Sequence, residues 1–217
     1  MKKGLTELVF ILDKSGSMSG LEADTIGGYN SMLAKQQAIE GECFITTVLF
    51  NNNYELLHDR IDLKAVREMT GKEYAVDGST ALLDAIGRTI HKIGNAQKHT
   101  AEDFRAEKVL FVIITDGEEN ASREYSADKI RALIQQQKTK YGWEFIFLGA
   151  NIDAVQTAGQ FGIAPDRTAD YLADCEGTGL NFRVMSAAVA TFRKTGIIDE
   201  ACFEEIRQDM RKRRGRK

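Results

Sequence analysis

Short apolar runs alternate along this chain with stretches whose apolar residues repeat at helical spacing. Runs rich in Val, Ile and Phe are typical of strands buried on both faces of a parallel sheet, and four occur, at 8–12, 44–50, 109–114 and 145–148. A further extended run, Tyr54–Leu57, follows the second of these after only three asparagines. This connection is too short for a crossover helix, so we predict that the run is the far arm of a hairpin at a sheet edge.

Amphipathic helices are predicted in most of the intervals between the runs. Their apolar residues recur three and four positions apart, and Ser126 and Gly142 are the expected N-cap and stop of one helix. Gly27 and Gly28 weaken another by roughly 1 kcal/mol per glycine. The predicted helices cover about 21–39, 82–93, 126–142, 182–192 and 203–210. The alternation predicts an α/β fold with a doubly wound, mostly parallel sheet of Rossmann-like type and one antiparallel edge strand.

Composition is typical of a water-soluble protein. The chain has 217 residues, 43% of them hydrophobic, and no apolar run near the roughly 20 residues that span a bilayer. Its first apolar stretch is too short for a signal peptide, and three cysteines without zinc or redox spacing indicate reduced thiols. We therefore expect a cytoplasmic protein without membrane contact, with a main domain at 1–196 and a C-terminal helix and basic tail at 197–217.

The net charge of −3 conceals a basic tail on an acidic body. Residues 211–217 hold six cations and no acid, which leaves 23 cations against 32 acids in the other 210 residues. We predict that this tail is a solvated, unstructured end. Binding of nucleic acid through residues 211–217 is the less favoured alternative.

Oxygen-bearing side chains gather just after the ends of predicted strands. Asp13, Ser15 and Ser17 alternate in the loop after the first strand, Thr80 precedes a predicted helix, and Asp116 follows a later strand. In a doubly wound sheet such loops meet at the carboxyl edge, where ligands bind. Two carboxylates and three hydroxyls form a hard oxygen site suited to Mg²⁺ or Mn²⁺ and not to Zn²⁺. Water and one outside oxygen would complete the shell.

Other loop chemistries need residues that this chain lacks at the matching positions. A haloacid-dehalogenase-like phosphatase needs a second Asp where Ser15 stands. An EF-hand loop beginning at Asp13 needs Gly at its sixth position and Glu at its twelfth, where the chain has Met18 and Asp24. Neither the phosphate-binding loop nor the dinucleotide-binding glycine motif occurs, so no motif implies a nucleotide.

Each candidate residue also has an ordinary structural interpretation when it is taken alone. Ser, Thr, Asp and Gly after strands commonly cap helices or form turns, and only their combination favours a metal. Glu118 and Glu119 are expected to be solvated loop charges. No set of nucleophile, base and acid is visible, and the three histidines lie at no ligand or triad spacing. A metal-dependent phosphohydrolase that uses the same strand-end carboxylates stays open as the alternative function.

Together these fragments resemble the metal-ion-dependent adhesion site of von Willebrand factor A-like domains. Asp13-x-Ser15-x-Ser17 follows a first apolar strand, Thr80 lies in a Gly-Ser-Thr loop, and Asp116 precedes a glycine after a later strand. The order matches, and the resemblance covers roughly residues 4 to 195.

The resemblance implies a role for each of these residues. The hydroxyls of Ser15, Ser17 and Thr80 would bind Mg²⁺ or Mn²⁺, and Asp13 and Asp116 would bind it directly or through water. An Asp or Glu of a protein partner would fill the open position. The resemblance thus implies a protein–protein interaction module of the single-domain bacterial or phage type, and not an enzyme.

Overall fold

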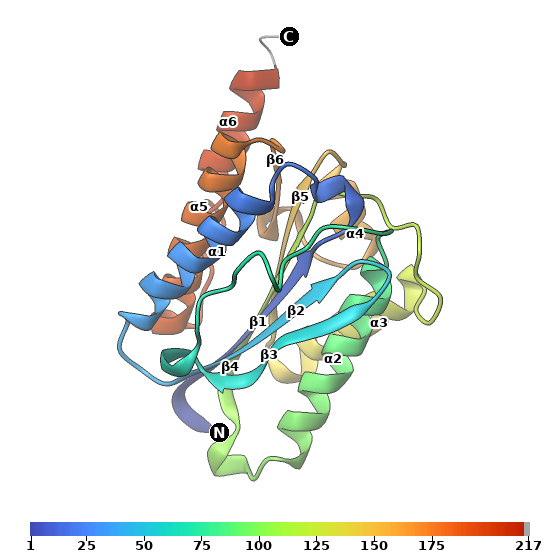
Figure 1. The fold of residues 1–217 in the computed structure, drawn as a ribbon. Helices are drawn as coiled ribbons and strands as arrows, with labels where there is room; N and C mark the ends of the chain where they lie inside the picture. Colours follow the sequence, from blue (N-terminus) through green and yellow to red (C-terminus); the bar gives the residue numbers. More distant parts are fainter. Residues whose placement is uncertain (215–217) are drawn as a thin grey trace.

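The computed structural model describes residues 1–214, which form one six-stranded sheet between two layers of helices (Figure 1). The strands are β1 (Lys2–Asp13), β2 (Cys43–Phe50), β3 (Tyr54–Asp62), β4 (Ala106–Thr115), β5 (Glu144–Ala150) and β6 (Thr168–Tyr171). The longer helices are α1 (Glu22–Gln37), α2 (Leu82–His99), α3 (Ala127–Tyr141), α4 (Ala154–Gln160), α5 (Cys175–Thr195) and α6 (Glu204–Arg214).

The strand order is β3-β2-β1-β4-β5-β6, and β3 alone among these strands runs antiparallel to its neighbour. Tyr54 pairs with Phe50 across the predicted hairpin. The predicted α/β class, the doubly wound sheet and the antiparallel edge strand are therefore confirmed. The chain builds the sheet outward in one direction from β1 and in the other from β4, so its switch point lies between β1 and β4. Ligands bind at this point in doubly wound sheets.

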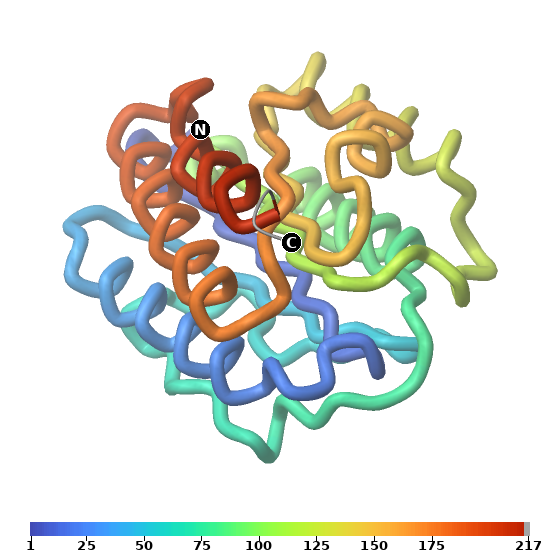
Figure 2. Tube along the Cα trace, turned by 90° about the horizontal axis from the view of Figure 1, so that it is seen from above, coloured from blue at the N-terminus to red at the C-terminus, as the bar shows by residue number. Residues whose placement is uncertain are grey.

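Alternate residues of β1 point to opposite helix layers. Leu8, Phe10 and Leu12 belong to the core that the sheet shares with α1, α5 and α6, whereas Val9 and Ile11 belong to the core under α2, α3 and α4. All five are at most 1% exposed. Figure 2 shows the two helix layers on either side of the central strands. Burial on both faces explains why the strands read as continuous apolar runs.

Two predicted helix signals have physical counterparts in the structure. The Ser126 hydroxyl accepts a hydrogen bond from the Lys129 amide, and Gly142 ends α3 in the left-handed conformation at φ 66°. Gly28 serves packing, because a Cβ there would lie 2.4 Å from the Phe182 ring of α5. The glycine that weakens α1 therefore lets α1 approach α5.

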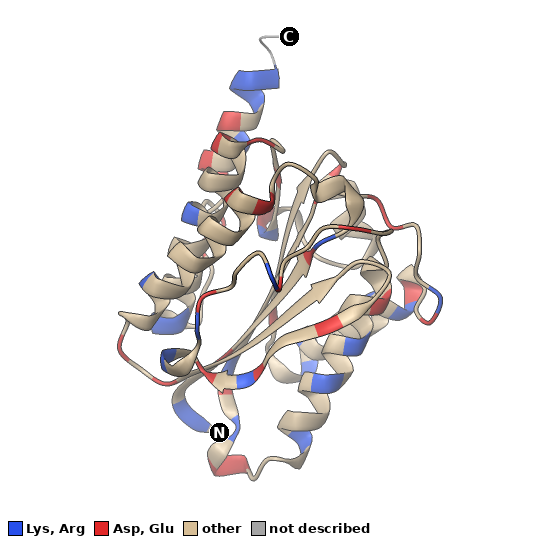
Figure 3. Ribbon diagram, viewed as in Figure 1, with Lys and Arg blue, Asp and Glu red and all other residues tan. Residues whose placement is uncertain are grey.

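Three features of the described residues differ from prediction or were not predicted. The short elements α4 and β6 were not predicted. The tail is not unstructured from residue 211, because α6 continues to Arg214 and carries cations in its last turn (Figure 3). Arg213 in that turn pairs with Asp174 at 2.9 Å and Asp209 at 3.0 Å. The rest of the basic tail, residues 215–217, lies outside the described residues.

The last helix is part of the same hydrophobic core as the sheet. Phe203 is fully buried and Ile206 is 1% exposed, and both pack in the core shared with α1 and α5. The division of the chain at residue 196 stays a prediction. None of the helices within residues 1–214 has the length and apolar character that crossing a bilayer requires.

Candidate metal centre

The structure brings all five predicted site residues together at the carboxyl end of the sheet. The Thr80 hydroxyl donates to Ser15 Oγ at 3.0 Å, and Ser15 Oγ lies 3.0 Å from Ser17 Oγ. Ser17 in turn donates to Asp116 Oδ1 at 2.6 Å. The Ser15 amide donates to Asp13 Oδ1 at 2.7 Å and so joins the last residue to the group. The cluster lies at the switch point, since β1 ends at Asp13 and β4 ends one residue before Asp116.

Asp13 is held firmly beneath the cluster. Its second carboxylate oxygen, Oδ2, accepts a hydrogen bond of 2.5 Å from the Thr115 hydroxyl, and its carbonyl oxygen accepts one from the Tyr74 hydroxyl. The residue is 1% exposed, and burial raises the pKa of its carboxyl above the usual value. Both carboxylate oxygens are therefore oriented before any ion binds.

Asp116 has a carboxylate oxygen without a partner. Oδ1 accepts from Ser17, but Oδ2 is buried and has no hydrogen-bond partner among the residues that the structure describes. Burial, with a smaller contribution from the charge of Asp13, raises the pKa of Asp116 to about 6. A buried carboxylate oxygen without a donor is unfavourable unless a cation or proton neutralises it.

Two glycines keep space in and around the cluster. A Cβ at Gly117 would lie 2.9 Å from both Ser17 Oγ and Thr80 Oγ1, so any larger side chain would intrude between these hydroxyls. At Gly16 a Cβ would lie 3.2 Å from the carbonyl oxygen of Gly78, to which the Gly16 amide donates at 3.0 Å. Gly16 therefore brings the first loop against the loop that carries Thr80.

Side chains outside the predicted set position the loops. Asn120 Oδ1 accepts from the Thr80 amide at 2.9 Å, and Thr115 orients Asp13. Tyr74 anchors the end of β1 through the Asp13 carbonyl. The sequence offered one local signal for these three residues, the position of Thr115 next to Asp116 at the end of a buried strand. Asn120 and Tyr74 act through long-range contacts that no local pattern indicates.

Glu119 is not the solvated loop charge that the sequence predicted. One carboxylate oxygen accepts from the Leu83 amide in the first turn of α2 at 2.8 Å and from the Ser122 hydroxyl at 2.7 Å. The other accepts from the amides of Ala121 and Ser122 at 2.9 and 2.7 Å. Glu119 thus caps α2 from a distant loop, since the N-cap residue Ala81 has no side chain that could do so. Glu118 is exposed, as predicted.

The donor chemistry and the orphaned oxygen fit a divalent cation that prefers oxygen. Hydroxyl and carboxylate oxygens suit Mg²⁺ and Mn²⁺, and a cation beside Asp116 would compensate the unpartnered Oδ2. Within residues 1–214 no three His, Cys, Asp or Glu side chains form a metal cluster. A metal at this place would therefore depend on the three hydroxyls.

Three solved structures with a similar fold place this architecture among known proteins. A von Willebrand factor type A protein from Catenulispora acidiphila superposes with a TM-score of 0.60 at 15% identity, over 85% of this chain and 42% of that one. A mutant of the PilB minor pilin from Streptococcus sanguinis superposes with a TM-score of 0.59 at 12% identity, over 87% of this chain and 62% of that one. For the pilus adhesin SpaC from Lactobacillus rhamnosus GG the TM-score is 0.64 at 10% identity, over 88% of this chain and 31% of that one.

The likeness to these structures establishes the fold. The sheet order, the edge strand and the helix layers are those of an α/β von Willebrand factor A-like fold, as predicted. This chain spans between 31% and 62% of the length of the three proteins. Comparisons with protein-family models and with curated proteins found no match.

Proposed function

We propose that this chain is a metal-dependent protein-interaction module that binds an acidic side chain of a partner protein. Mg²⁺ or Mn²⁺ would be held by Asp13, Ser15, Ser17, Thr80 and Asp116. The observation that carries the proposal is the buried Oδ2 of Asp116, which has no partner among the described residues and lies in a cluster of three hydroxyls. An ion there would resolve an otherwise unfavourable burial.

The charge of the site leaves the ion able to take one more anionic oxygen. Asp13 and Asp116 bring two negative charges, and the hydroxyls bring none. A divalent cation bound by them is neutralised overall and keeps Lewis acidity for a carboxylate from outside. Ser17 is exposed, whereas the other four residues are at most 3% exposed. A partner therefore approaches the ion from the side of Ser17.

Glu119 does not oppose this approach. Both of its carboxylate oxygens are occupied by donors at the first turn of α2 and in its own loop. Its charge is directed to the helix amino terminus, where it is stabilised. Among the carboxylates of the loop at 116–120, Glu118 is the exposed one.

Support for a binding role, and against catalysis, comes from two further observations. One structural neighbour is described as a pilus adhesin. The chain's three histidines lie away from the cluster: His58 contacts Tyr29 and Thr47, and His91 and His99 are on α2. The candidate site thus has no imidazole base, and we include non-enzyme status in the proposal.

The proposal extends to the setting of the protein. Cys43, Cys175 and Cys202 are free thiols in the structure, as in a reducing compartment. We therefore propose a cytoplasmic module of the bacterial or phage type.

Calorimetric titration with Mg²⁺ and Mn²⁺ tests the metal site. Wild type should bind either ion, and Thr80→Ala should weaken binding because it removes one oxygen ligand without changing charge. Thr139→Ala is the matched control, since that hydroxyl is exposed on α3 and donates to the Gln135 carbonyl. Absence of ion binding at millimolar concentration, or equal affinity in all three proteins, would contradict the site.

Partner binding is tested by capture from extract in Mg²⁺ and in EDTA, followed by titration of the protein that differs between the two. Affinity should require the ion and fall in Thr80→Ala but not in Thr139→Ala. Equal affinity with and without metal would show that the partner uses another surface. Turnover of a generic phosphoester with Mg²⁺, abolished by Asp13→Asn, would instead favour a phosphohydrolase.

A further inference from the structure

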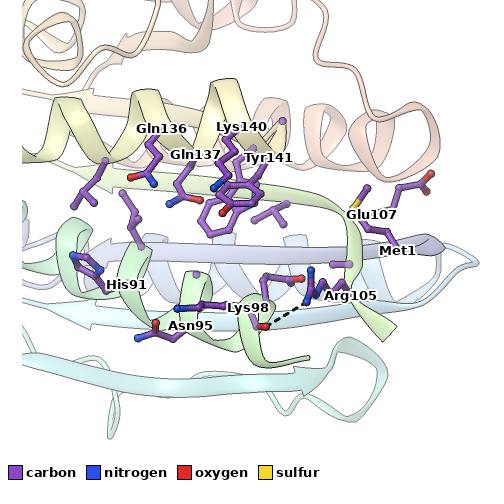
Figure 4. A pocket seen from close by; sticks show the side chains of 18 of the residues that line it. Met1, His91, Asn95, Lys98, Arg105, Glu107, Gln136, Gln137, Lys140 and Tyr141 are labelled. Atoms are coloured by element: carbon purple, nitrogen blue, oxygen red, sulfur yellow. Dashed lines mark hydrogen bonds between the residues drawn. The ribbon is translucent and has the colours of Figure 1, made fainter. Parts of the chain in front are cut away.

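A cleft of about 820 Å³ opens between α2 and α3 at the amino ends of β4 and β5, the opposite end of the sheet from the candidate metal centre (Figure 4). Its volume falls within the range of roughly 300–1,000 Å³ typical of small-molecule sites. The proposed metal function does not use this cleft.

Gln137, one of the residues that line the cleft, carries an unsatisfied polar atom. It occupies a position in the inward-facing stripe of α3, in line with Ile130 and Ile134, and only 8% of it is exposed. Its Oε1 is buried and has no hydrogen-bond partner among the described residues. Figure 4 shows its side chain directed between the two helices. A buried amide without a partner in the wall of a cavity calls for a ligand that hydrogen-bonds it.

Apolar and aromatic surfaces surround this amide. Ile90 from α2 and Leu133 from α3 face the cleft, with Trp143 and Tyr141 at its inner and outer parts. Trp143 is 5% exposed and stacks on Phe111 with ring centroids 5.4 Å apart, whereas Tyr141 is 52% exposed. A flat ring would fit these walls while its edge reaches Gln137.

Two lysines face the cleft from opposite helices. Lys98 is in the last turn of α2 and Lys140 in the last turn of α3, and Figure 4 shows them on the two sides of the opening. At these positions each also offsets the negative end of its helix dipole. The helix dipoles account for the positions of the two lysines but not for the unsatisfied amide of Gln137. Lys98, Lys140 and Gln137 together fit a ligand with a ring and an anionic group.

We propose that this cleft binds an adenine mononucleotide. A glutamine amide matches the adenine edge once the side chain turns its buried Oε1 toward the cleft. Oε1 then accepts from the amino group and Nε2 donates to the adjacent ring nitrogen. The phosphate is held by Lys98 and Lys140. Because the two lysine side chains hold the phosphate, this mode of binding needs no glycine-rich loop. The sequence accordingly has no phosphate-loop motif.

The test uses Trp143, the only tryptophan in the chain, as the reporter. Adenosine 5′-monophosphate should change its fluorescence saturably in the full-length protein. Inosine 5′-monophosphate, which lacks the amino group, and adenosine, which lacks the phosphate, should each bind about tenfold more weakly. Free tryptophan amide measured in parallel corrects for absorption by the nucleotides.

Variants of the cleft separate this site from non-specific quenching. Gly94→Phe should abolish binding, because Gly94 lines the cleft and no atom lies within 4 Å of a Cβ there. Gly27→Phe, at an equally open position on α1, should leave binding unchanged. Gln137→Leu should remove the preference for the adenine over the inosine nucleotide. Asp116→Asn should bind as wild type, because the cleft is independent of the metal centre.

Three results would overturn the proposal. The first is that the fluorescence of Trp143 shows no saturable change in the wild-type protein. The second is equal affinity of the wild type for the adenine and inosine nucleotides. The third is undiminished nucleotide binding by a Gly94→Phe variant that folds cooperatively. Should Gly94→Phe fail to fold, Gln137→Leu decides: an unchanged nucleotide preference in that variant would equally overturn it.

Discussion

The hydroxyl of Ser17 donates a 2.6 Å hydrogen bond to Oδ1 of Asp116, a residue 99 positions later in the chain. It is the one donor that the described side chains supply to this carboxylate, whose second oxygen is buried without a partner. The bond joins the loop after β1 to the loop after β4 across the switch point of the sheet. The same pair would then become neighbouring ligands of one ion.

Replacing Asp116 by asparagine should stabilise the metal-free protein. Burial raises the pKa of the Asp116 carboxyl from its usual value of 3.8 to about 6. The folded state therefore binds the proton of Asp116 more tightly than the unfolded state does, and this stabilises the protein at low pH. The stabilisation is complete below the unfolded-state pKa and is lost as the pH rises through about 6. At neutral pH in EDTA, Asp116→Asn should raise the free energy of unfolding by about 1–3 kcal/mol, measured by urea unfolding. It should also lose any stabilisation by Mg²⁺. A variant less stable than wild type in EDTA would contradict this account of the buried charge.

Binding of Mg²⁺ should weaken on acidification at an unusually high pH. The ion needs an ionised Asp116, and protons compete for it below a pKa of about 6. Between pH 7 and pH 5 the ionised fraction, and with it the affinity, should fall about tenfold. The raised pKa of Asp13 acts in the same direction. Calorimetry at these pH values, in buffers of different ionisation enthalpy, measures both the affinity and the protons released. If the affinity for Mg²⁺ stays unchanged down to pH 5, Asp116 is excluded as a ligand.

Glu119 should contribute strongly to stability, and its neighbour Glu118 should not. Glu119 accepts hydrogen bonds from the Leu83 amide and from the amide and hydroxyl of Ser122, whereas Glu118 is exposed. Charged acceptors at a helix amino terminus are worth more than neutral ones. We expect Glu119→Ala to lower the free energy of unfolding by about 2 kcal/mol and Glu118→Ala by less than about 0.5 kcal/mol. Equal effects in chemical unfolding would show that the distant cap of α2 does not form.

The sheet was predictable from sequence because burial on both faces leaves a continuous apolar run. The apolar run at 109–114, which lies within β4, is an example. The clustering of Asp13, Ser15 and Asp116 was predictable because strand ends of a doubly wound sheet meet at one edge. Both inferences use local patterns with a known global consequence.

The features that escaped prediction depend on tertiary contacts. β6 has four residues, including the partly buried Asp170, and is fixed by its pairing to β5. The short helix α4 is capped by Asp153 at its own start and by Asp170, which accepts from the Ala154 amide at 2.7 Å. Glu119 is likewise satisfied by amides that the chain brings near only on folding. Sequence patterns do not specify such partners.

Adjacent glycines in α1 should respond to alanine with opposite sign. A Cβ at Gly28 would lie 2.4 Å from Phe182, whereas none of the surroundings lies within 4 Å of a Cβ at Gly27. Gly28→Ala should therefore push α1 from α5 and lower the free energy of unfolding by about 1–3 kcal/mol. Gly27→Ala should raise it by up to about 1 kcal/mol, because alanine favours the helix. Thermal and urea unfolding of both variants measure this difference. Equal stabilisation by the two substitutions would show that α1 and α5 do not pack this closely.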